Sequence, residues 1–217
     1  MTSASAVVIS AVAAILVSPL LASWTIGLTA DRASSTMRWW QPRPVGAQRL
    51  ILVATVAAIL TAGASRGAPL VAWWLFAAAG CVLSVVDVQH HLLPGRLVDP
   101  LAAAVMAALG VSVLMAGEPE RLLRAVLAAV VVGAVWFAVA FIAPSAMGLG
   151  DVRVAALAAG LLGWTSWSAV LAGQLAAFGL AVVTVAILTI TGPHTGRAMQ
   201  VPMGPALIAG AIVATWL

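Results

Sequence analysis

The chain has 217 residues, of which 64% are hydrophobic and 7% are charged. An ordinary soluble domain is about 45–50% apolar and about 25% charged, so this composition excludes a water-soluble globule. The formal net charge is +4, but all basic residues are arginines and none lies in a run that could bind nucleic acid, so no nucleic-acid partner is expected.

Apolar stretches bounded by charged residues, proline or glycine predict eight helices. A transmembrane helix takes about 20 residues, so the second and sixth stretches are short for a full crossing, and a core helix or a re-entrant segment would have the same pattern. We expect an all-α, polytopic membrane protein with about eight transmembrane helices, forming a single membrane domain over residues 1–217. The predicted helices cover residues 7–28, 50–64, 70–87, 100–116, 122–143, 151–164, 167–190 and 201–217.

The arginines predict the orientation of these helices. Most of them lie in or beside the gaps after odd-numbered stretches. Cytoplasmic loops carry an excess of arginine and lysine, so the odd-numbered gaps are expected to face the cytoplasm and both termini to lie outside. Residues 29–49 then form a short cytoplasmic loop.

Two of the six acidic residues lie where an apolar stretch meets its boundary. Asp87 ends the third stretch and Asp151 begins the sixth. An ionisable group at the edge of the membrane interior is costly and is a functional candidate. The predicted topology brings both carboxyl groups to the cytoplasmic face, where a charged and a protonated carboxyl group could together activate water, as in aspartic proteases. A proton relay through the membrane would use the same acids.

The two acids are expected to differ in protonation. Asp151 would lie at the positive N-terminal end of a helix, which favours negative charge. Asp87 would lie at a helix C-terminus in apolar surroundings, which favours the protonated form. Gly148 and Gly150 precede Asp151, and residues without a Cβ let a partner helix or a bound peptide approach closely.

Three other polar residues lead to more modest expectations. Asp99 and Pro100 form a pattern typical of a helix N-cap and first helical residue. Arg153 is expected to extend to the lipid headgroups, with the alternative that its fixed charge stabilises a charged Asp151. Gln174 is expected to hydrogen-bond between helices.

A metal site is not predicted. His90 and His91 are adjacent, so they cannot face one site from a helix, and no other histidine or cysteine lies at ligand spacing. Cys81 is the single cysteine in the chain, which leaves no cysteine-rich zinc site or disulfide framework.

Three ordered motifs resemble the type IV prepilin peptidase (prepilin leader peptidase) family of GxGD-type membrane aspartic proteases. Asp87-Val-Gln-His-His-Leu-Leu-Pro94 is similar to the family's acid followed by a polar stretch and an aliphatic–proline pair. Gly148-Leu149-Gly150-Asp151-Val152-Arg153 is similar to its second motif, with arginine where lysine is more frequent. Pro202-Met203-Gly204-Pro205 is similar to the start of its last helix, with methionine in place of phenylalanine. The resemblance covers residues 70–217, which we take as the peptidase core.

The resemblance implies an endopeptidase of the bacterial inner membrane that cleaves the basic leader of type IV prepilins or pseudopilins after glycine, at the cytoplasmic face. Prepilin or pseudopilin substrates and membrane lipid would be its partners. Asp87 and Asp151 would be the catalytic pair that activates water, with neither a covalent intermediate nor a metal. Carried over by motif, the substrate-binding or supporting residues would be Gly148, Gly150, Arg153, Pro94, Pro202, Gly204 and Pro205.

The first loop departs from the family pattern. Bifunctional members also N-methylate the new terminus with S-adenosylmethionine and carry a four-cysteine zinc-binding segment in this loop. Residues 29–49 contain no cysteine and are too few for such an insert. We therefore expect no cofactor, with S-adenosylmethionine needed only if methyltransferase activity is retained. A bifunctional peptidase/N-methyltransferase and a proton-coupled transporter remain the alternatives.

Overall fold

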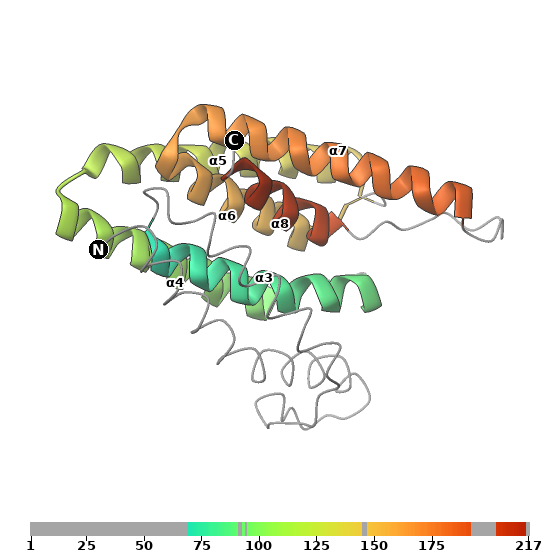
Figure 1. Ribbon diagram of the computed structural model, residues 1–217, viewed down its shortest axis with the longest axis horizontal. Coiled ribbons are helices and arrows are strands. Elements are labelled where there is room, and N and C mark those ends of the chain that lie inside the picture. Colours follow the sequence, from blue (N-terminus) through green and yellow to red (C-terminus); the bar gives the residue numbers. More distant parts are fainter. Residues whose placement is uncertain (1–68, 91–92, 94, 145–146, 192–202, 216–217) are drawn as a thin grey trace, which may run out of the picture.

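Six helices make up the part of the chain that the computed structural model describes, which is residues 69–90, 93, 95–144, 147–191 and 203–215 (Figure 1). Each overlaps one of the predicted helices, which confirms the all-α class for these residues. The predicted helices 7–28 and 50–64, and the loop 29–49, lie outside the described residues. The six helices are α3 (Leu70–His90), α4 (Gly95–Ala116), α5 (Pro119–Ile142), α6 (Leu149–Thr165), α7 (Trp167–Thr191) and α8 (Met203–Ala214).

Three of the described helices are long and apolar enough to cross a membrane. These candidate spans are Val98–Ala116 in α4, Pro119–Ile142 in α5 and Trp167–Ile187 in α7. Many large apolar side chains on α5 and α7 are exposed, as expected for helices that face lipid. The described residues therefore support a membrane protein, but they do not confirm eight transmembrane helices.

The short helix α6 lies inside the bundle. Most of its side chains are buried, and it packs along α5 while also contacting α7 and α8. Figure 1 shows α5 to α8 together on one side of the molecule, with α3 and α4 on the other side. Burial on nearly every face explains why α6 is apolar all round although it is shorter than a transmembrane helix.

Helix α4 begins earlier than the sequence pattern predicts. Asp99 was expected to cap a helix starting at Pro100, but the helix starts at Gly95 and Pro100 lies inside it. A proline lacks the backbone N–H that a helix interior uses. The additional N-terminal turn of α4 is accompanied by an ion pair between Asp99 and Arg153 of α6. The local sequence pattern does not predict this tertiary contact.

Helices α5 and α7 are joined by a polar contact in the apolar bundle. The indole Nε1 of Trp136 donates a hydrogen bond to Oε1 of Gln174 at 2.8 Å, and the Trp136 ring stacks on Phe178 with 5.3 Å between centroids. The expected hydrogen bond of Gln174 between helices is confirmed.

Arg124 of α5 holds the C-terminal end of α6. Its guanidinium donates hydrogen bonds to three carbonyls: Nε to Gly163 at 2.6 Å, and Nη2 to Trp164 at 2.6 Å and to Thr165 at 3.0 Å. The last carbonyls of a helix lack partners within it, so this side chain supplies the missing donors.

Replacing Arg124 with methionine should lower the stability of the bundle. The expected cost is about 1–3 kcal/mol, because two partly buried carbonyls and one exposed carbonyl lose their donors, and thermal unfolding in detergent would measure it. Arg121→Met is the matched control, since Arg121 pairs with Glu118 at the surface and such pairs contribute at most about 1 kcal/mol. Equal losses in the two variants would contradict the capping role of Arg124.

Candidate active site

Asp87 is the buried acid of α3. Its exposed fraction is 4%, and it is the one charged or polar residue among the buried side chains of the described chain. The backbone N–H of Gly204 donates a hydrogen bond to its Oδ2 at 2.9 Å. Gly204 is the second residue of α8, so the N-terminal end of α8 points at this carboxyl group. The hydrogen bond joins residues 117 positions apart in the chain.

Asp151 lies in the first turn of α6, and its two carboxyl oxygens have different surroundings. Oδ2 accepts a hydrogen bond from the backbone N–H of Gly148 at 3.1 Å, as an acid at the third helical position often does. Oδ1 is buried and has no hydrogen-bond partner among the described residues. A buried oxygen without a partner is costly. One oxygen thus fixes the side chain, and the other remains available to a ligand.

Burial raises the pKa of Asp151 from 3.8 to about 6. The hydrogen bond from Gly148 acts in the opposite direction, and the negative charge of Asp87 raises the pKa further. Asp151 lies outside the three candidate spans. The electrostatic effect of Asp87 on Asp151 means that the structure brings these two predicted site residues close enough to interact.

The expected difference between the acids rested on the helix ends and on the apolar surroundings of Asp87, and the structure adds further influences on both. Burial opposes the charge on Asp151, whereas Asp87 accepts a hydrogen bond at the start of α8, a contact that its own helix does not reveal. With a pKa of about 6, Asp151 is mainly charged at neutral pH. Which acid carries a shared proton stays a prediction, because an interacting pair titrates as a unit.

This pKa predicts opposite pH dependences for cleavage and for stability. If Asp151 acts as the base, the cleavage rate should rise as the pH passes through about 6. Because the folded pKa exceeds the ordinary 3.8, the contribution of Asp151 to stability is fully present below pH 4 and is lost as the pH rises towards about 6. Rate profiles and thermal unfolding of the wild type and Asp151→Asn would measure both. A stability difference between the two proteins that does not change over this range would contradict the buried position of Asp151.

Leu93 brings three segments together at this site. A Cβ atom built on Gly150 would lie 2.5 Å from the Leu93 Cβ and 2.6 Å from the Leu93 carbonyl oxygen. A Cβ atom on Gly204 would lie 2.8 Å from Asp87 Oδ2 and 3.3 Å from Leu93 Cδ1. Both glycines therefore permit approaches that any side chain would block. The segment after α3 and the first turns of α6 and α8 meet around the two acids.

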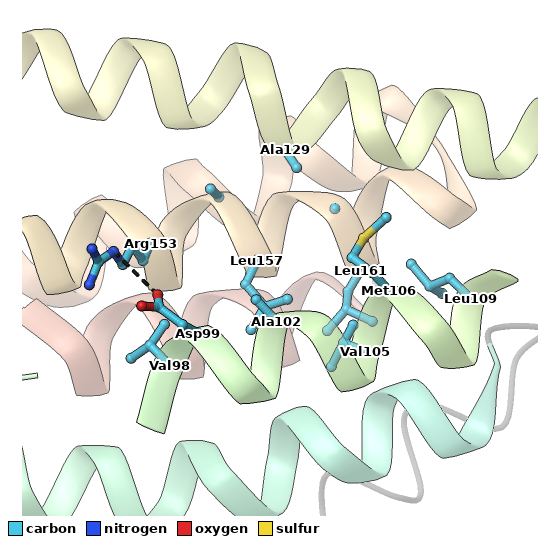
Figure 2. A pocket seen from close by; sticks show the side chains of 12 residues that line it. Val98, Asp99, Ala102, Val105, Met106, Leu109, Ala129, Arg153, Leu157 and Leu161 are labelled. Atoms are coloured by element: carbon cyan, nitrogen blue, oxygen red, sulfur yellow. Dashed lines mark ion pairs between the residues drawn. The ribbon is translucent and has the colours of Figure 1, made fainter. Parts of the chain in front are cut away.

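Arg153 does not contact Asp151. Its Nε lies 3.4 Å from Oδ1 of Asp99 on α4, as Figure 2 shows. Residues two positions apart on a helix are separated by roughly 200° around its axis, so Arg153 projects to the side of α6 opposite Asp151. The alternative in which Arg153 stabilises a charged Asp151 is therefore wrong, whereas the half-exposed guanidinium agrees with a position near the headgroups.

Pro94 and Pro202, like His91, lie outside the described residues, whereas Pro205 is half-buried in the first turn of α8. Gly148 is the N-cap residue of α6. Within the described part of the chain, no group of three or more histidine, cysteine or acidic residues is placed to hold a metal ion.

Comparison with known proteins identifies a family. The model of the type IV leader peptidase family matches residues 69–191, a range that contains Asp87 and Asp151 and ends before the Pro202–Pro205 motif. Comparisons with curated proteins and with solved structures gave no match. Because the family match covers more than half of the 217 residues, the chain belongs to the type IV leader peptidase family.

Proposed function

We propose that this protein is an aspartic endopeptidase of the bacterial inner membrane that cleaves the basic leader of type IV prepilins or pseudopilins after glycine, at the cytoplasmic face. Membership of a peptidase family supports the reaction class. The observation that carries the catalytic assignment is the pairing of buried Asp87 with Asp151, whose Oδ1 is buried and has no partner among the described residues.

In the proposed reaction, a water molecule lies between the two carboxyl groups. One carboxyl group of the pair, in its charged form, takes a proton from the water as the water oxygen attacks the scissile carbonyl. The other carboxyl group, in its protonated form, gives its proton to the carbonyl oxygen, so that a tetrahedral diol forms. Collapse of the diol breaks the C–N bond: the leaving amine takes the proton that came from the water, and a diol hydroxyl returns its proton to the second carboxyl group.

Two features support a joint role of the two acids. The pKa of Asp151, about 6, lies near the working pH, which is where a general base is most effective. The hydrogen bonds from Gly148 and Gly204 each hold one carboxyl oxygen in place, which limits the motion of the pair. Fixed catalytic groups need less reorganisation during the reaction.

The test is cleavage of a synthetic prepilin-like peptide by the purified full chain in liposomes. The peptide should carry a basic leader, a glycine and about 20 apolar residues, with a matched peptide in which the glycine is replaced by valine. We expect cleavage after the glycine alone, detected by mass spectrometry of the products. Absence of cleavage in proteoliposomes that instead move protons would favour the transporter alternative.

S-adenosylmethionine would be needed only for a second activity. Adding it with the cleaved peptide tests for N-methylation, and we expect no methylated product, because the loop 29–49 contains no cysteine. A methylated N-terminus would establish the bifunctional alternative and leave the peptidase assignment unchanged.

A further inference from the structure

An apolar groove between α4 and α6 is not used by the proposed reaction (Figure 2). Its volume is about 230 Å³, and its floor includes the buried side chains of Val105, Leu109 and Leu161. On α6 the groove is lined by Arg153 and by Leu157 one turn later, which share one face of the helix. Asp151 lies on the opposite face, so the groove is separate from the two acids.

The groove opens between two candidate spans. Ala102 and Met106 of α4 and Ala129 of α5 line it and are partly exposed. Helix α4 packs mainly against α3 and contacts α5 and α6 less, and the small alanine side chains do not fill the space that remains. Because α4 and α5 are both apolar enough to cross a membrane, this opening faces the region that lipid acyl chains occupy.

One end of the groove is charged. Asp99 and Arg153 pair across it, and their side chains are 61% and 48% exposed. Asp99 is the second residue of the candidate span Val98–Ala116, so the pair lies where the apolar segment of α4 begins, at the depth of the headgroups. An ion pair this exposed contributes at most about 1 kcal/mol, and both partners can share their charge with a ligand.

We propose that the groove binds one phospholipid with an ethanolamine headgroup. An acyl chain lies on the apolar floor, the phosphate accepts hydrogen bonds from the Arg153 guanidinium, and the ammonium donates hydrogen bonds to the Asp99 carboxylate. The pair with Asp99 uses Nε of Arg153, and the guanidinium has further N–H donors that suit phosphate oxygens.

Charge complementarity selects this headgroup. Opposite charges side by side match a headgroup that carries both a phosphate and a primary ammonium. A glycerol headgroup offers no cation to Asp99 and leaves two negative groups near each other. A choline headgroup has a cation without N–H donors, so it cannot hydrogen-bond to the carboxylate.

Native mass spectrometry of the purified full chain tests the proposal. Phosphatidylethanolamine, phosphatidylglycerol and phosphatidylcholine with the same acyl chains are added separately. We expect one phosphatidylethanolamine molecule to be retained, with about five-fold weaker retention of the other two lipids. Asp99→Asn should remove most of this preference, and it avoids any change of side-chain size.

Two neighbouring residues provide a matched pair of variants. Ala102→Leu puts extra side-chain volume into the groove, whereas Ala103→Leu makes the same change at an exposed position of α4. We expect Ala102→Leu to reduce retention of phosphatidylethanolamine at least five-fold, and Ala103→Leu to leave it unchanged.

Three outcomes would overturn the proposal. These are equal retention of the three lipids, unchanged retention in Ala102→Leu, and cross-linking of a photoreactive residue at position 106 to a co-expressed prepilin instead of to lipid. The last outcome would assign the groove to the substrate. Because these readouts do not depend on peptide cleavage, they separate this proposal from the proposed function.

Discussion

Asp87→Asn and Asp151→Asn are each expected to abolish leader cleavage, with a rate loss of roughly 10⁴-fold. Asparagine keeps the size of the side chain and an oxygen that can accept the hydrogen bonds from Gly204 and Gly148. It can neither take a proton from water nor share one with its partner. Single-turnover cleavage of the prepilin-like peptide, with matched protein concentrations, measures the loss.

Glu120→Gln is the control for the removal of one carboxylate. Glu120 is exposed in the first turn of α5, so its loss should leave cleavage unchanged. Thermal unfolding at pH 8 should show Asp151→Asn to be at least as stable as the wild type, since burial opposes the charge that the variant removes. Cleavage above about a tenth of the wild-type rate in either aspartate variant would exclude that acid from the reaction.

Gly150→Ala is expected to reduce the cleavage rate about 100-fold. The new Cβ would lie within 2.6 Å of the Leu93 carbonyl oxygen, which is backbone and cannot rotate away. The segment after α3 must therefore move from the start of α6, and this separates Asp87 from Asp151. A displacement of about 1 Å can cost 100-fold in rate. Cleavage rates measured over a range of substrate concentrations should show a lower kcat and an unchanged KM.

Gly179→Ala is the matched control. Gly179 is also helical, but a Cβ at this position would have no described atom within 4 Å. Alanine in an open helical position stabilises by about 0.5–1 kcal/mol, so this variant should be slightly more stable and fully active. Full activity in Gly150→Ala would mean that the approach of Leu93 to α6 is not needed for the reaction.

The positions of the long helices and the pairing of the two acids could be predicted from the sequence. Long apolar runs with charged boundaries locate α4, α5 and α7 within a few residues, because a membrane-spanning helix has few other possible compositions. Asp87 and Asp151 each lie at the edge of such a run, and the arginine distribution assigns both edges to one face. The interaction between the two acids agrees with that placement.

The contact partners of individual side chains could not be predicted from the sequence. Gly204 was identified by motif, but its hydrogen bond to Asp87 depends on how α8 lies against α3. Arg153 was considered as a partner of Asp151 because the two are adjacent in sequence, although helical geometry turns them apart. Its contact with Asp99 depends on α4 starting at Gly95, a full turn before the Asp99-Pro100 pattern.

Arg124 has a structural role that the prediction of membrane orientation did not consider. That prediction counted each arginine only as a charge near a loop, whereas Arg124 donates hydrogen bonds to the last carbonyls of α6. One signal was present in the sequence: Gly163-Trp164-Thr165 ends an apolar run with no glycine or asparagine after it, so the usual C-terminal cap is missing. Such an end requires donors from elsewhere in the chain.

The central claim is that Asp87 and Asp151 form one site. Carbon-13 NMR of labelled aspartate in the purified chain can follow the titration of Asp151 in the wild type and in Asp87→Asn, with Glu120→Gln as the control. Because the charge of Asp87 raises the pKa of Asp151, the account predicts a lower apparent pKa for Asp151 in Asp87→Asn and no change in Glu120→Gln. The same Asp151 pKa in all three proteins would show that the two acids do not interact, and would contradict the account.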